Sequence, residues 1–200
     1  MAIDPGQHWN FGPVRVQGLA WTPGQPGEPQ VRPLLGQWLR LPPERLPLRR
    51  DAHGRPRLQA PLEEHDAGWS HSGDRLLLAL GHRVRLGVDL EFLRPRPRAL
   101  ELARRFFAPG EAQRLQALAP AERERAFLRL WCAKEALLKA HGRGLAFGLH
   151  RLELGAEDGD PRAPLRLLRC DPELGPAAAW QLHEWQPQPG YLAALAWRQR

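Results

Sequence analysis

The chain has 200 residues, and its composition excludes several classes of protein. Lys and Arg number 29 against 22 Asp and Glu, so the formal net charge is +7. An apolar share of 42% and a charged share of 26% are those of a folded domain, not of a disordered chain. The first residues carry Asp4 and no apolar run, so we expect neither a secretory signal nor a membrane segment.

The positive charges are divided very unevenly. Twenty-seven are arginines, and the only two lysines, Lys134 and Lys139, fall within one six-residue stretch. A surplus of arginine favours an anionic partner, such as nucleic acid, a phosphorylated ligand or an acidic protein. Charge alone leaves open the alternative of a basic surface that serves only solubility.

Chain length and cysteine usage narrow the class further. Two hundred residues allow one ordinary domain, or two small ones that share a core. Cys132 and Cys170 form neither a disulfide framework nor the Cys/His spacing of a zinc site. A reducing compartment fits this usage, so we expect a cytoplasmic protein.

The first 50 residues are rich in proline and glycine and predict little regular structure. We expect a strand over 14–21, a loop over 22–29 and a helix over 31–40, followed by a basic turn over 49–57. None of these segments predicts a strong core of its own.

Stronger patterns begin near residue 69. A polar turn is expected over 70–73, followed by strands over 76–80 and 84–92. Residues 94–98, with the sequence RPRPR, are expected to be extended because a proline disfavours a helical residue before it.

The remaining sequence predicts helices and then strands. Helices are expected over 99–107, 111–119 and 121–141, and the last has apolar residues at spacings of three and four and ends before Gly142. Strands are expected over 149–154, 165–170, 180–185 and 191–197. Two strands, then helices, then strands are typical of the α+β class.

An acidic pair lies on the predicted strand over 84–92. Asp89 and Glu91 are two residues apart, so they share one face of the strand while Val88 and Leu90 point to the core. Two carboxylates at that spacing suit a hard divalent cation such as Mg²⁺. The alternative is the polar face of a half-buried strand.

A second charged pair lies on the long predicted helix. Glu135 and Lys139 are four residues apart and therefore stack on one helix face. They form either a surface ion pair, worth about 0.3–0.5 kcal/mol, or a functional pair. In the second case Glu135 is a further metal ligand or general base, and Lys139 is a cation beside a phosphate.

Two shorter polar segments are weaker signals. Ser70 and His71 lie in the predicted turn SHSG, whose hydroxyls and amides suit phosphate oxygens. Arg55 lies in Gly-Arg-Pro within the basic segment. A catalytic triad built on Ser70 and His71 is not expected, because there is no nucleophile elbow and neighbouring strand residues point apart.

Together the charged residues suit metal-assisted phosphoryl chemistry. The metal neutralises charge, a carboxylate activates the nucleophile and a lysine stabilises the leaving group. Two enzyme classes fit at this level: a transferase that uses a pyrophosphate-containing donor, and a metal-dependent nuclease or phosphodiesterase.

The order and spacing of five motifs resemble one family. The motifs are GRP at 54–56, SHSG at 70–73, LGVDLE at 86–91, RRFF at 104–107 and WCAKEALLKAHGRGL at 131–145. They resemble the 4′-phosphopantetheinyl transferases, most closely the Sfp-type enzymes and their short bacterial members that act as holo-acyl-carrier-protein synthases. The resemblance runs through residues 50 to 155.

The resemblance implies a reaction and roles for the acids. The family transfers the phosphopantetheine arm of coenzyme A to a serine of an apo acyl or peptidyl carrier protein, with Mg²⁺, and releases 3′,5′-ADP. Asp89, Glu91 and Glu135 match the metal-binding acids. Glu135 also matches the base that activates the carrier serine, either directly or through water.

The resemblance also implies how coenzyme A is held. Lys139 matches the lysine near the pyrophosphate that assists departure of 3′,5′-ADP. Ser70 and His71 match the segment that holds the 3′-phosphate end, and Arg55 matches a basic residue near the same phosphates. A relative that binds carrier proteins without catalysis is a further alternative, which the intact acids and Lys139 oppose.

The implied fold is α+β, with two similar halves, 1–85 and 86–200, in a pseudo-twofold arrangement around a cleft for coenzyme A. A monomer that binds neither nucleic acid nor membrane is expected. Its carrier partner is acidic, and a basic segment beside the acids suits such a partner, with Phe106 and Phe107 adding apolar contact. The arginines of this segment are Arg94, Arg96, Arg98, Arg104 and Arg105.

The N-terminal half departs from the family pattern. Sfp-type enzymes have more chain before the first motif, including basic residues that touch the 3′-phosphate, whereas this region is short here. We expect Arg49, Arg50 or Arg57 to take over that role.

Overall fold

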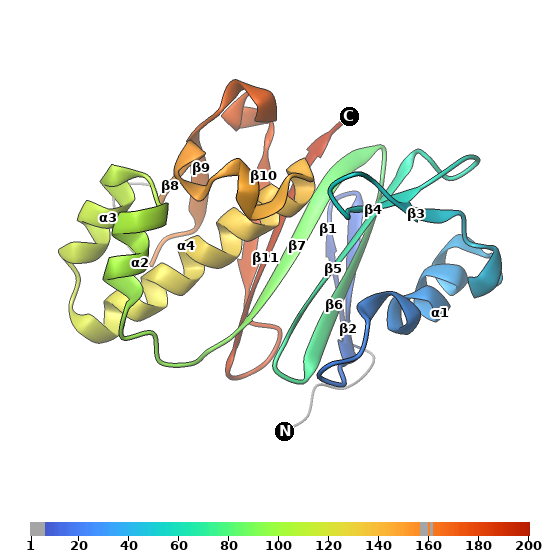
Figure 1. Cartoon of the computed structure of the whole chain (residues 1–200), viewed down its shortest axis with the longest axis horizontal. Coiled ribbons are helices and arrows are strands. Elements are labelled where there is room, and N and C mark those ends of the chain that lie inside the picture. Colours follow the sequence, from blue (N-terminus) through green and yellow to red (C-terminus); the bar gives the residue numbers. More distant parts are fainter. Residues whose placement is uncertain (1–6, 157–159, 161) are drawn as a thin grey trace.

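The computed structural model describes residues 7–156, 160 and 162–200. Figure 1 shows α1 at one end of the molecule, α2 and α3 at the other end, and the twisted strands between them, with α4 running from the α2 and α3 end into the middle. The helices are α1 (Gly27–Leu39), α2 (Ala99–Phe106), α3 (Pro109–Gln116) and α4 (Pro120–His141). The strands are β1 (His8–Phe11), β2 (Val14–Ala20), β3 (Leu48–Arg50), β4 (Pro56–Leu58), β5 (His65–Ser72), β6 (Arg75–His82), β7 (Val84–Phe92), β8 (Leu152–Ala156), β9 (Leu165–Cys170), β10 (Gln181–Trp185) and β11 (Tyr191–Gln199).

The N-terminal part of the chain forms a core in which residues before 59 pack against β5 and β6, so those early segments have no core of their own, as the sequence predicts. Its sheet has the order β1-β2-β6-β5, and α1 packs on one face through Val31 and Leu35, neither of which is exposed. The helix begins at Gly27, four residues earlier than predicted. Pro29 is tolerated there because it falls in the first turn, where the main-chain N–H that proline lacks would have no helical partner. The basic turn predicted over 49–57 is the β3–β4 hairpin.

The polar turn predicted over 70–73 is wrong for its first three residues, which are the end of β5. Ser70 and His71 lie within the strand and pair in register with Leu77 and Leu76 of β6. The reversal falls at Gly73, whose φ of +60° suits glycine. Glycine, serine and histidine are weak strand formers, so β5 depends on the leucine-rich β6 beside it.

The second sheet carries the acidic pair. Its order is β10-β11-β7, and β7 pairs antiparallel with β11 along the full length of both strands. One face of β7 packs against the first sheet through Val84, Leu86, Val88 and Leu90. The other face, with Asp89 and Glu91, points toward α4, as the two-residue alternation predicts.

Gly87 allows α4 to lie directly on β7. A Cβ at this position would be 2.1 Å from the carbonyl oxygen of Ala136 and 2.3 Å from the amide nitrogen of Ala140. Figure 1 shows α4 running across β7 and β11, with β8 and β9 beyond it. The helix face that carries Glu135 and Lys139 is thereby brought next to the acids of β7.

The two sheets meet at β5 and β7 without a shared hydrogen-bond ladder. Side chains of β5 instead accept from main-chain amides of β7. Asp66 Oδ2 accepts from the N–H of Leu86 at 2.9 Å, and Ser72 Oγ accepts from the N–H of Phe92 at 3.0 Å. Side-chain hydrogen bonds therefore join β5 to β7 near both ends of the seam, and no main-chain pairing joins these strands between them.

The predicted mixture of helices and separate sheets is confirmed. The pseudo-twofold relation and the division at residues 85 and 86 stay predictions. Among the helices of the described residues, none is long and apolar enough to cross a membrane.

Candidate active site

A cavity of about 240 Å³ opens along the seam between the sheet that contains β5 and the sheet that contains β7. Arg50, His53 and Arg55 of the β3–β4 hairpin line one side, and Lys139 of α4 lies on the other. Gly68 and Trp69 of β5 and Gly87 and Val88 of β7 complete its wall. The cavity combines cationic side chains with the face of an indole ring, which suits an anionic ligand that carries an aromatic group.

Asp89, Ser70 and Lys139 form one hydrogen-bonded cluster beside this cavity. Lys139 Nζ donates to Asp89 Oδ1 at 2.6 Å and to Ser70 Oγ at 2.8 Å, and the Ser70 hydroxyl donates to Asp89 Oδ1 at 2.9 Å. Burial alone would lower the pKa of Lys139, but the Asp89 carboxylate outweighs it and the pKa is raised. Residues from β5, β7 and α4 thus meet at one charged point.

Glu91 is the second acid of the pair, and its surroundings disfavour its ionised form. Its side chain is 18% exposed, and Arg96 approaches it with Nη2 3.6 Å from Oε2. Burial, followed by the charge of Asp89, raises the pKa of Glu91 to about 7. The carboxylate therefore ionises at a free-energy cost that a nearby cation would remove.

Glu135 has an open carboxylate. Within the described part of the chain, no hydrogen bond or ion pair engages it, although it lies near Asp89 and Lys139. Burial and then the charge of Asp89 raise its pKa. A half-buried carboxylate with a raised pKa and no partner is suited to accept a proton or bind a cation.

The donor set fits a hard divalent cation. Asp89 Oδ2 is buried and has no hydrogen-bond partner. Burial and the charge of Asp89 disfavour the ionised forms of Glu91 and Glu135. Carboxylate oxygens are the ligands that Mg²⁺ prefers. Over residues 7–156, 160 and 162–200, however, no three His, Cys, Asp or Glu side chains converge as a preformed metal site. Lys139 and Arg96 hold two of the acids instead.

We expect Glu91→Gln to stabilise the metal-free protein at pH 8. Because the pKa of Glu91 is about 7 in the fold and about 4.5 in the unfolded chain, its ionisation destabilises the fold by about 3 kcal/mol above pH 7. Below about pH 4.5 both states hold the proton and the difference vanishes. Urea midpoints of wild type and variant should therefore separate at pH 8 and coincide at pH 4.5. A separation at both pH values would contradict this origin.

The other predicted ligand-binding residues lie around the same seam. His71 stacks on Trp21, with ring centroids 4.1 Å apart, and burial lowers its pKa. Arg55 is buried, and its Nη2 donates to Asp66 Oδ2 at 2.5 Å and to the carbonyl of Leu86 at 2.7 Å. Arg55 therefore ties the hairpin to both strands of the seam while also lining the cavity.

Of the three arginines expected to contact the 3′-phosphate, Arg50 lines the cavity. Its guanidinium lies over the ring of Trp69, 5.5 Å from the centroid, and pairs with Glu28 at 3.3 Å. Arg57 pairs with Asp51 at 3.1 Å. His53 and Trp69 are cavity residues that the sequence did not single out, because they join the site only when the hairpin folds over β5.

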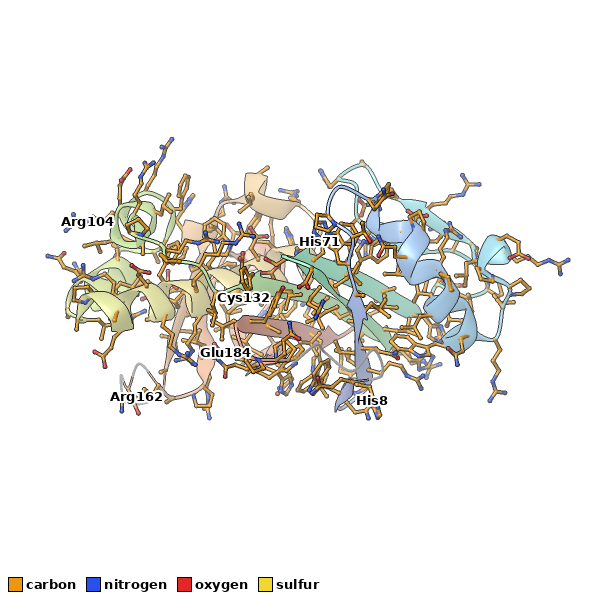
Figure 2. The ribbon with its side chains drawn as sticks, turned by 90° about the horizontal axis from the view of Figure 1, so that it is seen from below. His8, His71, Arg104, Cys132, Arg162 and Glu184 are labelled. Atoms are coloured by element: carbon orange, nitrogen blue, oxygen red, sulfur yellow. The ribbon has the colours of Figure 1, made fainter. Side chains whose placement is uncertain are left out.

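Cys132 lies behind the acids. It is buried on α4, one turn before Glu135, and its thiol donates weakly to the carbonyl of Leu192 at 3.9 Å. Figure 2 shows Cys132 near the middle of the molecule and His71 on the neighbouring half. Burial, with Asp89 and Glu91 nearby, raises the pKa of this thiol well above its ordinary value, so it stays protonated.

Comparisons with known proteins identify the family of this chain. The family described as the 4′-phosphopantetheinyl transferase superfamily matches residues 85–196. The Synechocystis protein slr0495 is 34% identical over 177 residues, which cover 84% of this chain and 68% of the relative. The 4′-phosphopantetheinyl transferase HetI of Nostoc is 33% identical over 168 residues, 83% of this chain and 66% of the relative.

Two further similarities cover less. The 4′-phosphopantetheinyl transferase psf-1 of Bacillus pumilus is 35% identical over 142 residues, which cover 70% of this chain and 58% of the relative. The crystal structure of holo-[acyl-carrier-protein] synthase from Neisseria meningitidis has a TM-score of 0.39 at 20% identity, over 57% of this chain and 97% of that one.

The chain belongs to the 4′-phosphopantetheinyl transferase superfamily. Its enzyme class is that of a 4′-phosphopantetheinyl transferase, as the motif order predicts. The chain spans about two thirds or less of the length of the relatives HetI and psf-1.

Proposed function

We propose that the protein transfers the 4′-phosphopantetheine group of coenzyme A to a serine of an apo acyl or peptidyl carrier protein and releases 3′,5′-ADP. The observation that carries the proposal is the cluster of Asp89, Ser70 and Lys139, which joins both halves beside a cationic cavity and next to the open carboxylate of Glu135. Membership of the family supports the general reaction, and this cluster contains residues that we propose to perform it.

Coenzyme A is the proposed occupant of the seam cavity. Its phosphates would meet Arg50, His53 and Lys139, and Trp69, over which Arg50 lies, is the aromatic residue that lines the cavity near its adenine. Ser70 lies on β5 at the same seam, and His71 follows it on this strand, where it stacks on Trp21. The pairing of Arg55 with Asp66 supports a part in holding the hairpin against the strands as well as in binding phosphate.

Asp89, Glu91 and Glu135 are the proposed holders of a Mg²⁺ ion. The ion would neutralise charge on the pyrophosphate and on the three acids. The orphaned Asp89 Oδ2 and the raised pKa values of Glu91 and Glu135 support this assignment.

The chain's own residues can carry the remaining steps. Glu135 accepts the proton of the carrier serine, whose oxygen then bonds to the phosphorus of the phosphopantetheine group. The bond from that phosphorus to the bridging oxygen of 3′,5′-ADP breaks, and Lys139 stabilises the charge that develops on the departing phosphate. Ser70 holds Lys139 and Asp89 in one orientation.

Lys139→Ala is expected to lower kcat more than it weakens coenzyme A binding. Removal of one positioned charge at a developing anion costs roughly 10²–10³ in kcat. Steady-state kinetics and a direct binding titration separate the two effects. Normal kcat with weakened coenzyme A binding would make Lys139 a binding residue only.

An acidic carrier protein is the proposed acceptor, and the segment from Arg94 to Phe106 is its proposed docking face. Arg104 and Arg105 are exposed, and Phe106 is 37% exposed with Arg105 lying over its ring. Phe107 does not contribute, contrary to the sequence prediction, because it is buried and stacks on Phe127 at 5.2 Å. A basic, partly aromatic surface of this kind attracts acidic partners.

One experiment separates the candidate functions. The protein is incubated with coenzyme A, Mg²⁺, an apo carrier protein and a short DNA duplex, and all products are analysed. A modified carrier and intact DNA support the transferase. Cleaved DNA with unmodified carrier would support the nuclease, and a complex without modification would support a binding protein.

A further inference from the structure

The segment between β7 and α2 places one arginine on the acidic cluster. Arg94, Arg96 and Arg98 alternate with prolines, and each has a different partner. Arg94 lies over the ring of Phe92 at 5.4 Å, and Arg98 makes two hydrogen bonds to Glu101. Arg96 alone among these three approaches an acid of the proposed metal site.

The main chain of Arg96 is held firmly. Its N–H donates to Glu124 Oε2 at 2.8 Å, and its carbonyl accepts from the N–H of Ala99 at 2.9 Å. The ring of Pro97 restricts Arg96 to extended dihedral angles. The main chain of Arg96 is thus fixed at both its N–H and its carbonyl.

The side chain of Arg96, in contrast, is held weakly. Its guanidinium is 35% exposed and reaches Glu91 by a single contact of 3.6 Å, which is an ion pair but not a hydrogen bond. An exposed pair of this kind is worth little and is easily replaced by a stronger cation or by water.

We propose that Arg96 is the internal counter-ion of Glu91, and that it competes with the divalent cation for this carboxylate. The inference rests on the proposed metal site. In the metal-free protein the guanidinium partly neutralises Glu91, and on metal binding it moves off toward solvent while its main chain stays in place. Arg96 is therefore a positioning residue that sets the metal affinity.

The charge of Arg96 opposes the entry of a second cation. Loss of this charge should tighten metal binding, whereas loss of an ordinary metal-site residue would weaken it. Since both Glu91 and the guanidinium are partly open to water, we expect a change of about three- to tenfold in Kd.

The test is a titration of the metal-free protein with Mn²⁺ at pH 8 without coenzyme A, followed by the electron paramagnetic resonance signal of free Mn²⁺. Arg96→Gln should bind Mn²⁺ about three- to tenfold more tightly than wild type, and Arg96→Lys should stay close to wild type. Arg98→Gln is the matched control, because it removes the same charge two residues away, and should change Kd by less than about twofold.

Equal Kd values for Arg96→Gln and Arg98→Gln, or weaker binding by Arg96→Gln, would overturn the counter-ion role. Absence of Mn²⁺ binding from wild type and all variants would instead overturn the proposed metal site, and this inference with it. Circular dichroism of each variant establishes that the fold is retained.

Discussion

Asp89→Asn should abolish phosphopantetheine transfer while leaving the protein folded. The amide keeps the size of the side chain and can still accept hydrogen bonds from Ser70 and Lys139, but it loses the charge that both the ion and the lysine require. The buried Oδ2 that has no partner would become a neutral group. We expect kcat to fall by roughly 10³ or more, because electrostatic stabilisation by the ion and its ligands is a matter of several kcal/mol.

Asp74→Asn is the matched control for this experiment. Asp74 lies in the β5–β6 turn with its carboxylate 62% exposed, and the same substitution there should leave kcat within about twofold of wild type. Glu135→Ala should resemble Asp89→Asn in activity. An Asp89→Asn protein with normal kcat would contradict the assignment of the acids.

Lys134→Ala should be the most destabilising substitution in the long helix. Lys134 is completely buried, and its ammonium lies 2.7 Å from Glu111 Oε2 and donates to the carbonyls of Leu149, at 2.9 Å, and Leu152. Removal of one partner of a buried ion pair leaves an uncompensated charge, which costs about 3–5 kcal/mol. Denaturant unfolding monitored by tryptophan fluorescence measures this loss.

Glu111 explains why the loss should be large. It also accepts from the N–H groups of Ala108 and Leu154, so it joins the start of α3, the body of α4 and strand β8. Burial raises the pKa of Glu111 and lowers that of Lys134, and the attraction between them opposes both shifts. The double variant Lys134→Met with Glu111→Gln should therefore be less destabilised than the sum of the single variants. Additive losses would contradict a coupled pair.

The structure gives a separate reason for lysine, rather than arginine, at each of the two lysine positions of this arginine-rich chain. At Lys134 three oxygens surround one compact ammonium in a site with no exposure, and a planar guanidinium would not fit there. At Lys139 the ammonium bridges Asp89 and Ser70 across the seam. The sequence predicted Lys139 as a cation beside a phosphate but not this bridge, which depends on packing between elements. It gave no role for Lys134, because Glu111 lies 23 residues away and on another helix.

The elements that sequence predicted best have strong periodicity. Strand β7 has the predicted bounds, and α4 begins one residue early, since alternation and helical spacing specify both. Strand β5 was missed because its residues favour turns and its neighbour β6 decides its conformation. The seam was also out of reach, since Asp66, Arg55 and Leu86 come together only when the two sheets meet.

The sequence predicted which acids and which lysine lie together, but not which charged groups pair with one another. The spacing of Asp89 and Glu91 placed them on one face, and the four-residue spacing placed Lys139 beside Glu135. That Lys139 bonds to Asp89, that Arg96 reaches Glu91 and that Glu135 is left open are results of packing between elements. These contacts determine which of the carboxylates are neutralised by cationic side chains of the chain itself.

Transfer of phosphopantetheine to a carrier protein can be measured as a change in mass. An apo carrier protein is incubated with this protein, coenzyme A and Mg²⁺, and its intact mass is then determined. We predict that the carrier gains the mass of one phosphopantetheine arm, that one equivalent of 3′,5′-ADP appears, and that Asp89→Asn yields neither. An unmodified carrier with the wild-type protein, or an equal gain of mass with Asp89→Asn, would contradict the account.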